Sequence, residues 1–129
     1  MGKAYSLDGT LVHDGEWKHG KRHGPGKRYS EEGTLIYDGE WNCGNRHGVG
    51  KQYSTINGCL IYDGEWSNGW RDGTGKEYTH VNGRLIYDGE WSNGWRHGIG
   101  KQYSILNGRL IYDGEWDNGN HEGIGREYN

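Results

Sequence analysis

The apolar and polar positions of this chain follow one pattern that returns several times. Residues 60–67 read Leu-Ile-Tyr-Asp-Gly-Glu-Trp-Ser, and from the tyrosine onward large apolar side chains alternate with polar or small ones. A period of two residues is typical of a β-strand with one covered and one solvated face. Residues 70–79 follow as a second extended segment that contains Gly-x-Gly and ends in Tyr-Thr. The pattern therefore predicts two consecutive strands per unit.

Short glycine turns join these predicted strands. Asn68-Gly69 separates the two segments, and Asn82-Gly83 leads into the next unit. Asn-Gly is the preferred sequence of a two-residue type I′ turn because both of its positions need a positive φ. Other units have less favourable pairs in the same two slots, namely His19-Gly20, Cys43-Gly44 and Glu32-Gly33. Each unit is therefore predicted to be a β-hairpin.

The turn at residues 68–69 sets a register for the hairpin. It places Trp66 opposite Arg71, Gly64 opposite Gly73, and Tyr62 opposite Gly75. One face would then carry aromatic rings over bare glycine backbone. The other face would be solvated, with Asp63, Glu65 and Lys76 and with predicted cross-strand pairs Glu16–His23, Glu40–His47 and Glu90–His97.

The unit recurs five times, as the tetrapeptide Asp-Gly-Glu-Trp shows. Self-similarity with a fixed period is the signature of a repeat protein. The sequence predicts one tandem-repeat domain over residues 1–129, with a half unit at 1–12 and units that begin near residues 13, 37, 62, 87 and 112. We expect an all-β fold, an elongated single-layer antiparallel sheet of about eleven strands.

The period of 25 residues adds a constraint, because it is odd. Side chains of a strand alternate between faces, so an odd period cannot keep the tryptophans on one face through even-length turns alone. Each unit must contain a bulge or an odd loop. The Gly-x-Gly segment and the longer Ser-x-x-Asn-Gly segment are the two candidate places.

The composition shows what fills the core. The chain has 26 Gly and no Phe, its mean hydropathy is -1.13, and most of its apolar mass is in 7 Trp and 10 Tyr. Trp and Tyr bury large areas while a polar tip stays wet, which suits a thin sheet better than a two-layer fold.

The repeated motif resembles that of the MORN family, the membrane occupation and recognition nexus repeats. The second copy reads Tyr37-Asp-Gly39-Glu-Trp41-Asn-Cys-Gly44-Asn-Arg-His-Gly48-Val-Gly50. The motif recurs from Tyr62, Tyr87 and Tyr112, whereas the first copy has His13 in place of tyrosine. The resemblance implies a twisted trough of hairpins in a scaffold that engages helical or extended partners, self-associates, or tethers proteins to membranes or the cytoskeleton. Phosphoinositide binding is attributed to some members.

The aromatic rows are first of all the predicted core, but a single layer would leave much of each ring exposed. A continuous exposed aromatic strip is typical of a partner-binding surface. We therefore predict a docking groove for a protein helix, an extended segment or a second copy, with three arginines at its rim. Its residues are Trp17, Tyr37, Trp41, Tyr62, Trp66, Tyr87, Trp91, Tyr112, Trp116, Arg46, Arg71 and Arg96.

Trp70 and Trp95 depart from the repeat. Their slot holds Lys21, Asn45 and Asn120 in the other units, so the fold does not require an aromatic residue there. Two readings stay open. The pair packs between adjacent hairpins, or it forms an edge hot spot for a partner, a role in which tryptophan is over-represented.

The net charge of -3 is unevenly distributed, since residues 1–30 carry +3 and the remainder -6. The basic stretch contains Lys18, Lys21, Arg22, Lys27 and Arg28. It is either a solvated surface or a patch for anionic lipid headgroups. Nucleic acid is not an expected partner, because the rest of the chain would repel phosphate.

Catalysis, cofactors and metal are not expected. A catalytic site is one unique constellation, whereas the carboxylates here are copied five times. His23, His47 and His97 would form a column, but Asp72 and Glu122 interrupt it. The two isolated cysteines favour a reducing compartment, and we expect a cytoplasmic protein, either free or associated with a membrane or the cytoskeleton. A small-ligand module for sugar or choline is a further alternative, because aromatic repeats also build such solenoids.

Overall fold

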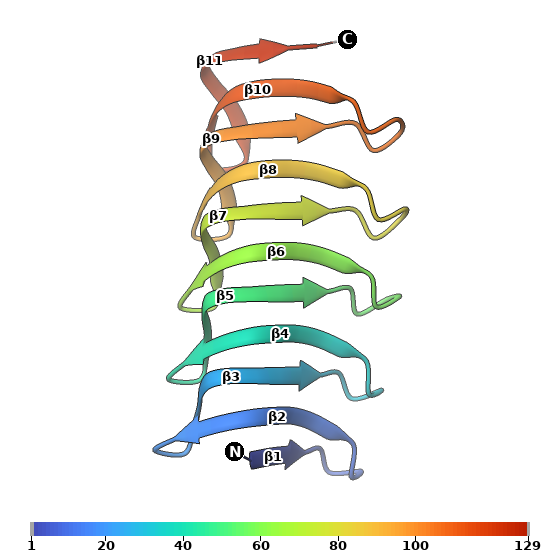
Figure 1. The fold of residues 1–129 in the computed structure, drawn as a ribbon, viewed down its shortest axis with the longest axis vertical. Helices are drawn as coiled ribbons and strands as arrows, with labels where there is room; N and C mark the ends of the chain where they lie inside the picture. Colours follow the sequence, from blue (N-terminus) through green and yellow to red (C-terminus); the bar gives the residue numbers. More distant parts are fainter. Residues whose placement is uncertain (1, 129) are drawn as a thin grey trace.

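The computed structural model describes residues 2–128, and these form a single antiparallel sheet in which the strands follow the order of the sequence (Figure 1). The strands are β1 (Gly2–Tyr5), β2 (Leu11–Lys18), β3 (Lys21–Tyr29), β4 (Leu35–Asn42), β5 (Asn45–Tyr53), β6 (Leu60–Ser67), β7 (Trp70–Tyr78), β8 (Leu85–Ser92), β9 (Trp95–Tyr103), β10 (Leu110–Asp117) and β11 (Asn120–Glu127). The predicted all-β hairpin array is confirmed.

Two kinds of strand alternate through the sheet. We call β2, β4, β6, β8 and β10 the A strands, because they carry the Asp-Gly-Glu-Trp sequence. We call β1, β3, β5, β7, β9 and β11 the B strands, and all of them except the short β1 carry Gly-x-Gly. Tight turns connect A to B at one side of the sheet, and longer turns connect B to A at the other side (Figure 1).

The tight turns have the predicted type I′ backbone. In the third hairpin φ is 49° at Asn68 and 87° at Gly69, and His19 and Cys43 take the same conformation with φ of 51° and 49°. The longer turns differ from the prediction, because Gly83 has a positive φ of 74° but Asn82 does not. Instead the Asn82 carboxamide accepts a hydrogen bond from the Arg84 amide at 3.1 Å, and the Thr79 amide closes the six-residue turn by donating to the Arg84 carbonyl at 2.9 Å.

The predicted register is correct beside the tight turn and wrong beyond it. Trp66 lies opposite Arg71, but Gly64 lies opposite Gly75, and Tyr62 opposite Glu77. The B strand contains two more residues than the A strand in this interval, and they bulge opposite Glu65.

The conformation of Gly73 explains that bulge. Its φ is 92°, which bends the strand, and the Glu65 carboxylate accepts a hydrogen bond from the amide of Thr74 at 2.7 Å. Glu40 makes the same bond to Val49, also at 2.7 Å, rather than a pair with His47. The predicted Glu–His pairs are therefore wrong, because the bulge takes the histidines out of register with the glutamates, and Glu40 and Glu90 accept from backbone amides instead.

The odd period is absorbed elsewhere. The two-residue shift in the Gly-x-Gly segment leaves side chains on their original faces. At the other side of β7, Glu77 pairs with Tyr87 and Tyr78 with Leu85, so Ile86 is an extra residue. This one-residue bulge restores every tryptophan to the same face. It lies at the start of the A strand, outside both segments considered from the sequence, so neither predicted location is correct.

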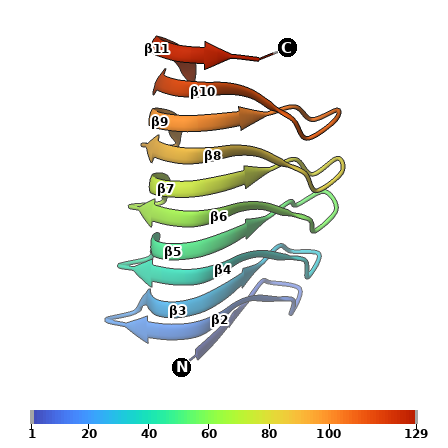
Figure 2. The ribbon, with the colours of Figure 1, turned by 45° about the horizontal axis from the view of Figure 1, so that its top comes forward.

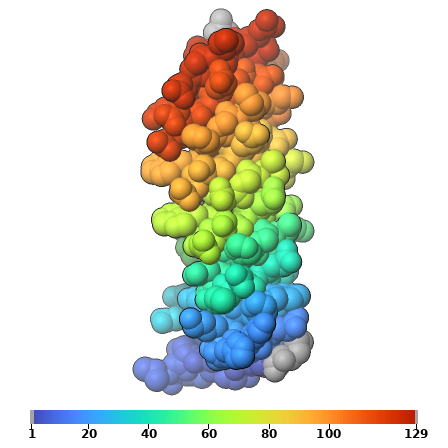
Figure 3. Space-filling model, turned by 90° about the vertical axis from the view of Figure 1, so that its left-hand side faces the viewer, coloured from blue at the N-terminus to red at the C-terminus, as the bar shows by residue number. Residues whose placement is uncertain are grey.

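The sheet twists along an elongated body (Figures 2 and 3). In the space-filling view the colours follow the chain from one end to the other, as expected when each repeat packs on its sequence neighbours. Within residues 2–128 there is no helix with the length and apolar character needed to cross a membrane.

The solvated face carries a regular charge pattern. Basic and acidic residues alternate across the sheet, because Lys27, Lys51, Lys76 and Lys101 of the inner B strands are each paired in register with the Asp of both adjacent A strands. We call this row the charge ladder. It consists of Lys3, Asp14, Lys27, Asp38, Lys51, Asp63, Lys76, Asp88, Lys101, Asp113 and Arg126.

Candidate interaction surface

The aromatic rows form the core on the opposite face of the sheet. Tyr37, Tyr62 and Tyr87 have no exposed surface, and Trp66 is 5% exposed. Trp66, Trp91 and Trp116 each pack edge-on between two tyrosines. The Trp66 ring centroid, for example, lies 5.1 Å from that of Tyr62 and 5.4 Å from that of Tyr37 in the preceding repeat. Such T-shaped contacts favour one defined arrangement of the rings.

Polar tips of these rings are satisfied by the backbone. The Trp66 indole Nε1 donates to the Gly50 carbonyl at 3.0 Å, and the Tyr62 hydroxyl donates to the Glu65 carbonyl at 2.9 Å. The tyrosine lies over Gly75, where an added Cβ would be 2.0 Å from the hydroxyl oxygen. Glycine is therefore required at this position by the close approach of the ring.

Arginines cover the rings from outside. The Arg71 guanidinium carbon lies 4.6 Å from the centroid of Tyr62 and 5.1 Å from that of Trp91. Arg46 and Arg96 occupy the same place in their repeats. This covering, together with the neighbouring hairpins, buries the aromatic strip, so the expectation of largely exposed rings is wrong. At the edge of the sheet the short strand β1 leaves Trp17 36% exposed.

Side-chain acceptors on the preceding B strand orient the arginines. Arg71 donates from Nη2 to Gln52 Oε1 at 2.9 Å, and Arg96 donates from Nη2 to Glu77 Oε1 at 2.8 Å. Glu77 also approaches Arg71 at 3.9 Å, and thus lies between two successive arginines. Sequence reasoning missed these acceptors. The sequence signal that could have identified them is their position directly after the lysine of the charge ladder, which places them on the aromatic face.

Burial shifts the pKa values of these groups. The loss of water around Tyr62 raises the pKa of its hydroxyl far above the usual value, which keeps it a hydrogen-bond donor. Burial likewise lowers the pKa of Arg71, against the opposing effect of Glu77. The Tyr62 hydroxyl therefore stays protonated at neutral pH.

His13 is the exception in the tyrosine row. It has no exposed surface, and neither ring nitrogen has a hydrogen-bond partner within residues 2–128. It packs edge-on between Trp17 and Trp41, each at 5.2 Å between centroids. Burial lowers its pKa to about 4, and the neighbouring guanidiniums of Arg22 and Arg28 act in the same direction.

Trp70 and Trp95 are exposed at the side of the tight turns. Their exposed fractions are 59% and 58%, yet one edge of each ring lies against the next hairpin. A Cβ added at Gly94 would be 2.8 Å from Trp70, and one at Gly119 would be 2.9 Å from Trp95. One edge of each ring thus packs on the glycine turn of the next hairpin, while more than half of each side chain stays exposed.

Shallow hollows lie beside these tryptophans. One is lined by Arg71, Glu77, Trp91, Gly94, Trp95 and Arg96. The equivalent hollow one repeat earlier includes Trp70 and Arg71. Each offers an apolar wall, a guanidinium and a carboxylate or carboxamide within one concave surface. We call the surface formed by Trp70, Trp95 and these hollows the tryptophan edge.

The predicted basic patch does not form one surface. Arg22 and Arg28 are half-buried on the aromatic face, where Arg28 pairs in register with Tyr37. Lys27 lies on the opposite face in the charge ladder, between Asp14 and Asp38. Lys18 and Lys21 face each other at the tight turn. The alternation of a strand separates residues that are adjacent in sequence.

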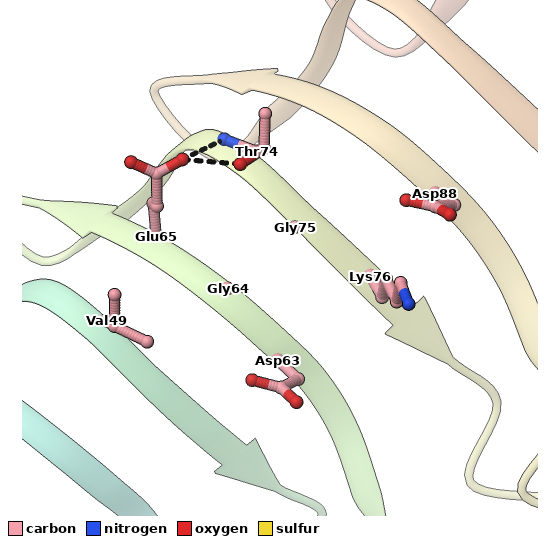
Figure 4. A pocket seen from close by; sticks show the side chains of 8 residues that line it. All are labelled: Val49, Asp63, Gly64, Glu65, Thr74, Gly75, Lys76 and Asp88. Carbon is pink, nitrogen blue, oxygen red and sulfur yellow. Dashed lines mark hydrogen bonds between the residues drawn. The ribbon is translucent and has the colours of Figure 1, made fainter.

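The ladder face is also hollowed (Figure 4). Glu65 reaches Thr74 there, while Asp63, Lys76 and Asp88 project from three adjacent strands. Over the described chain, no group of three or more His, Cys, Asp or Glu side chains is placed to hold a metal ion. The histidine column predicted from the sequence does not gather into a ligand set.

The fold and site define a class, the open repeat sheets whose hairpins share one continuous aromatic core. The family model for the MORN repeat matches five times, at residues 13–35, 37–59, 62–84, 87–104 and 112–128. The chain therefore belongs to the MORN repeat family. No curated protein gave a significant match. MORN repeats are generally non-catalytic, and they suggest a repeat-based interaction module or a membrane-associated module.

Proposed function

We propose that this chain is a non-catalytic interaction scaffold that binds a helix or an extended segment of a protein partner at the tryptophan edge. The observation that carries the proposal is the pair Trp70 and Trp95, which are 59% and 58% exposed at a slot that is polar in the other three hairpins. The fold stands without an aromatic residue there. Two large exposed rings in adjacent repeats therefore suit a binding role.

The structure changes which atoms of the predicted groove a partner would touch. The buried rings of Tyr62, Trp66 and their equivalents would contact a partner little. The accessible surface consists of the exposed tryptophans and the outer sides of the arginines, among them Arg71 and Arg96. An apolar or aromatic anchor beside an acidic group would match this combination.

The experiment compares the chain with a variant that carries Trp70→Asn and Trp95→Asn. Asparagine is the natural residue of this slot at positions 45 and 120, so the fold should persist. Both proteins are used for affinity capture from a native cell extract, and each captured partner is then measured with purified components. We expect a partner that binds the wild type and loses at least about tenfold in affinity with the variant.

The matched control is the double variant Lys21→Asn and Asn120→Ala, which alters the same slot outside the tryptophan edge. It should bind as the wild type does. Circular dichroism verifies that all variants are folded. Unchanged partner affinity in the tryptophan variant would contradict the proposal. Binding to vesicles with anionic lipid at low salt, unaffected by the tryptophan substitutions, would favour the membrane-associated alternative instead.

The small-ligand alternative has its own readout. Trp70 and Trp95 carry the largest exposed indole surfaces, so sugar or quaternary-amine binding would alter their fluorescence. If such a ligand changes the fluorescence spectrum of the wild type but not that of the tryptophan variant, the ligand of this surface is a small molecule and not a protein.

A further inference from the structure

The arginines over the aromatic core follow a rule that two of them break. In the later repeats, the side chain that lies over the core rings is an arginine or a histidine. It has a hydrogen-bond partner on the preceding B strand. Arg71 bonds to Gln52 at 2.9 Å, Arg96 bonds to Glu77 at 2.8 Å, and His121 contacts Gln102 at 2.8 Å. All three acceptors occupy the position that pairs in register with the tyrosine of the next A strand.

Arg28 occupies this acceptor position in the first repeat, where it pairs with Tyr37. The guanidinium that should find an acceptor there is that of Arg46, which lies 4.8 Å from the Tyr37 centroid and 5.2 Å from that of Trp66. A second guanidinium therefore stands where a carboxylate or carboxamide stands in the other repeats. The charge of Arg28 contributes, after burial, to a lowered pKa of Arg46.

Arg22 lacks an acceptor for a similar reason. The corresponding position on β1 is Ala4, which pairs with His13. Arg22 lies 5.9 Å from the Trp17 centroid and 5.4 Å from the Trp41 centroid, and its Nε is buried without a hydrogen-bond partner within residues 2–128. The charge of Arg28 also contributes to the lowered pKa values of Arg22 and His13, in each case after burial.

The carboxylates of this region do not neutralise the cluster. Asp14 and Asp38 lie on the other face in the charge ladder, and Glu40 is engaged with the amide of Val49. In the described part of the chain, the ion pairs made by arginine are those of Arg71 and Arg96. Three arginines thus lie on the aromatic face, and Arg22 and Arg46 have aromatic rings beneath their guanidiniums. None of the three forms an ion pair with a carboxylate of residues 2–128.

We infer that Arg22, Arg28 and Arg46 form a binding site for an oxyanion, a carboxylate or phosphate group, over the first two repeats. Guanidinium groups bind both kinds of oxyanion through paired N–H donors. Glu77 shows that a carboxylate fits between successive arginines on this face, because it lies 3.9 Å from Arg71 and 2.8 Å from Arg96. The site differs from the tryptophan edge, whose exposed rings belong to the third and fourth hairpins, although Arg46 borders both surfaces because it also lines the hollow beside Trp70.

The test titrates the protein with sodium phosphate and, separately, with sodium acetate, with sodium chloride holding the ionic strength constant. Nuclear magnetic resonance follows the arginine Nε–Hε and tryptophan indole signals. We expect saturable shifts of the Arg22 and Arg46 signals and of the Trp17 and Trp41 indoles. Stronger saturation by phosphate identifies a phosphate site, and stronger saturation by acetate identifies a carboxylate site. Shifts that remain linear for both anions would overturn the inference.

The variants locate the effect. Arg28→Gln installs the acceptor found at Gln52 and should weaken anion binding by about tenfold or more, given the strength of hydrogen bonds to charged groups. Lys27→Gln removes the same charge from the adjacent residue, but on the opposite face, and should leave the affinity unchanged. Equal losses in both variants, or no loss in Arg28→Gln, would each refute a specific site.

The melting temperature shows whether Arg28→Gln loses anion binding merely because the protein unfolds. Without added oxyanion, Arg28→Gln should raise the melting temperature by about 3 °C, because it removes like-charge contact and supplies the missing acceptor. The loss of anion binding then occurs in a more stable protein. A lower melting temperature in Arg28→Gln would show that the arginine already has a favourable partner and would contradict the inference.

Discussion

At the scale of single residues, each tyrosine of the core needs the absence of a side chain opposite its ring. Gly75 lies under Tyr62, and a Cβ there would be 2.0 Å from the hydroxyl oxygen and 2.4 Å from Cζ. Gly75→Ala should therefore destabilise the protein by about 3 kcal/mol, since the ring must leave its packed position. Urea denaturation followed by tryptophan fluorescence measures the change.

Gly83 provides the comparison for that substitution. It has a positive φ of 74°, and no atom lies within 4 Å of an added Cβ. Gly83→Ala should cost only the backbone strain of a left-handed residue, about 1 kcal/mol. A cost for Gly75→Ala no greater than that of Gly83→Ala would show that the ring moves freely.

His13 gives the protein a pH dependence that the other core positions lack. Its pKa of about 4 in the folded state lies below the value of about 6.5 for an exposed histidine. Between these values the unfolded chain binds a proton that the folded chain excludes. His13 therefore leaves the free energy of unfolding at its full value above about pH 6.5 and lowers it as the pH falls toward 4.

His13→Tyr should remove this dependence and increase stability at every pH, because a tyrosine hydroxyl in this row donates to a glutamate carbonyl, as Tyr37 does to Glu40 at 2.9 Å. The free energy of unfolding is measured at pH 7.5 and pH 5. The gap between variant and wild type should widen at pH 5. The exposed residue His80, changed to Gln, is the control, and a gap of equal size at both pH values would contradict the assignment.

Sequence alone could predict which aromatic residues form the core, because their spacing is visible in five copies. It could not predict that Arg71 would cover Tyr62, or that Gln52 would orient Arg71. Those contacts join residues of neighbouring repeats, and they depend on side-chain directions that the register determines. The expectation of exposed rings failed for this reason.

At the scale of the hairpin, the bulge in the B strand is held by a glutamate. Glu40 accepts from the Val49 amide at 2.7 Å, and Glu115 accepts from the Ile124 amide at 2.9 Å. In the first hairpin the equivalent position is Pro25, which has no N–H to donate. Glu40 therefore has a backbone partner in the second hairpin, whereas the equivalent Glu16 lacks this bond in the first.

Glu40→Ala should cost about 1.5 kcal/mol, the order of a hydrogen bond to a charged group, whereas Glu16→Ala should cost clearly less. Thermal and urea unfolding of both variants measure the difference. Similar costs for the two substitutions would mean that the glutamates act through their charge on the surface and not through the bulge.

Much of the hairpin was predictable. The strand over residues 60–67 and the type I′ turn follow from local sequence, since alternation and Asn-Gly are local signals. The register beyond the turn was not predictable in the same way. It depends on a left-handed Gly73 and on the Glu65 bond across the strands, and glycine abundance alone does not say which glycine bends.

At the scale of the whole molecule, the charge ladder connects all strands of one face. Asp63 pairs in register with Lys51 on one side and Lys76 on the other. Asp63→Lys would place three cations in a row. Each opposite-charge pair across strands contributes about 0.2–1 kcal/mol, so replacing two attractions by two repulsions should cost about 2 kcal/mol.

The cost of Asp63→Lys should shrink in high salt, because exposed charges are screened. Unfolding in low and high sodium chloride measures this effect. Glu31→Lys makes the same change of charge in an exposed turn and should have little effect at either salt concentration. An Asp63→Lys cost that salt leaves unchanged would point to packing instead of charge.

The candidate site was partly predictable at this scale. Trp70 and Trp95 stand out in sequence because three repeats lack them, and the structure leaves both exposed. The basic stretch looked continuous in sequence, yet the alternation of β3 divides it between two faces. Proximity in sequence is a poor guide to a shared surface inside a strand.

The indole of each later tryptophan is anchored to the repeat before it, as Trp41 is to Gly26, Trp66 to Gly50, Trp91 to Gly75 and Trp116 to Gly100. During synthesis on a ribosome, the amino-terminal hairpins emerge first. Each new hairpin can then pack on a preceding hairpin that is already folded, and its tryptophan completes the aromatic core of that hairpin. The molecule can thus assemble in the direction in which it is translated.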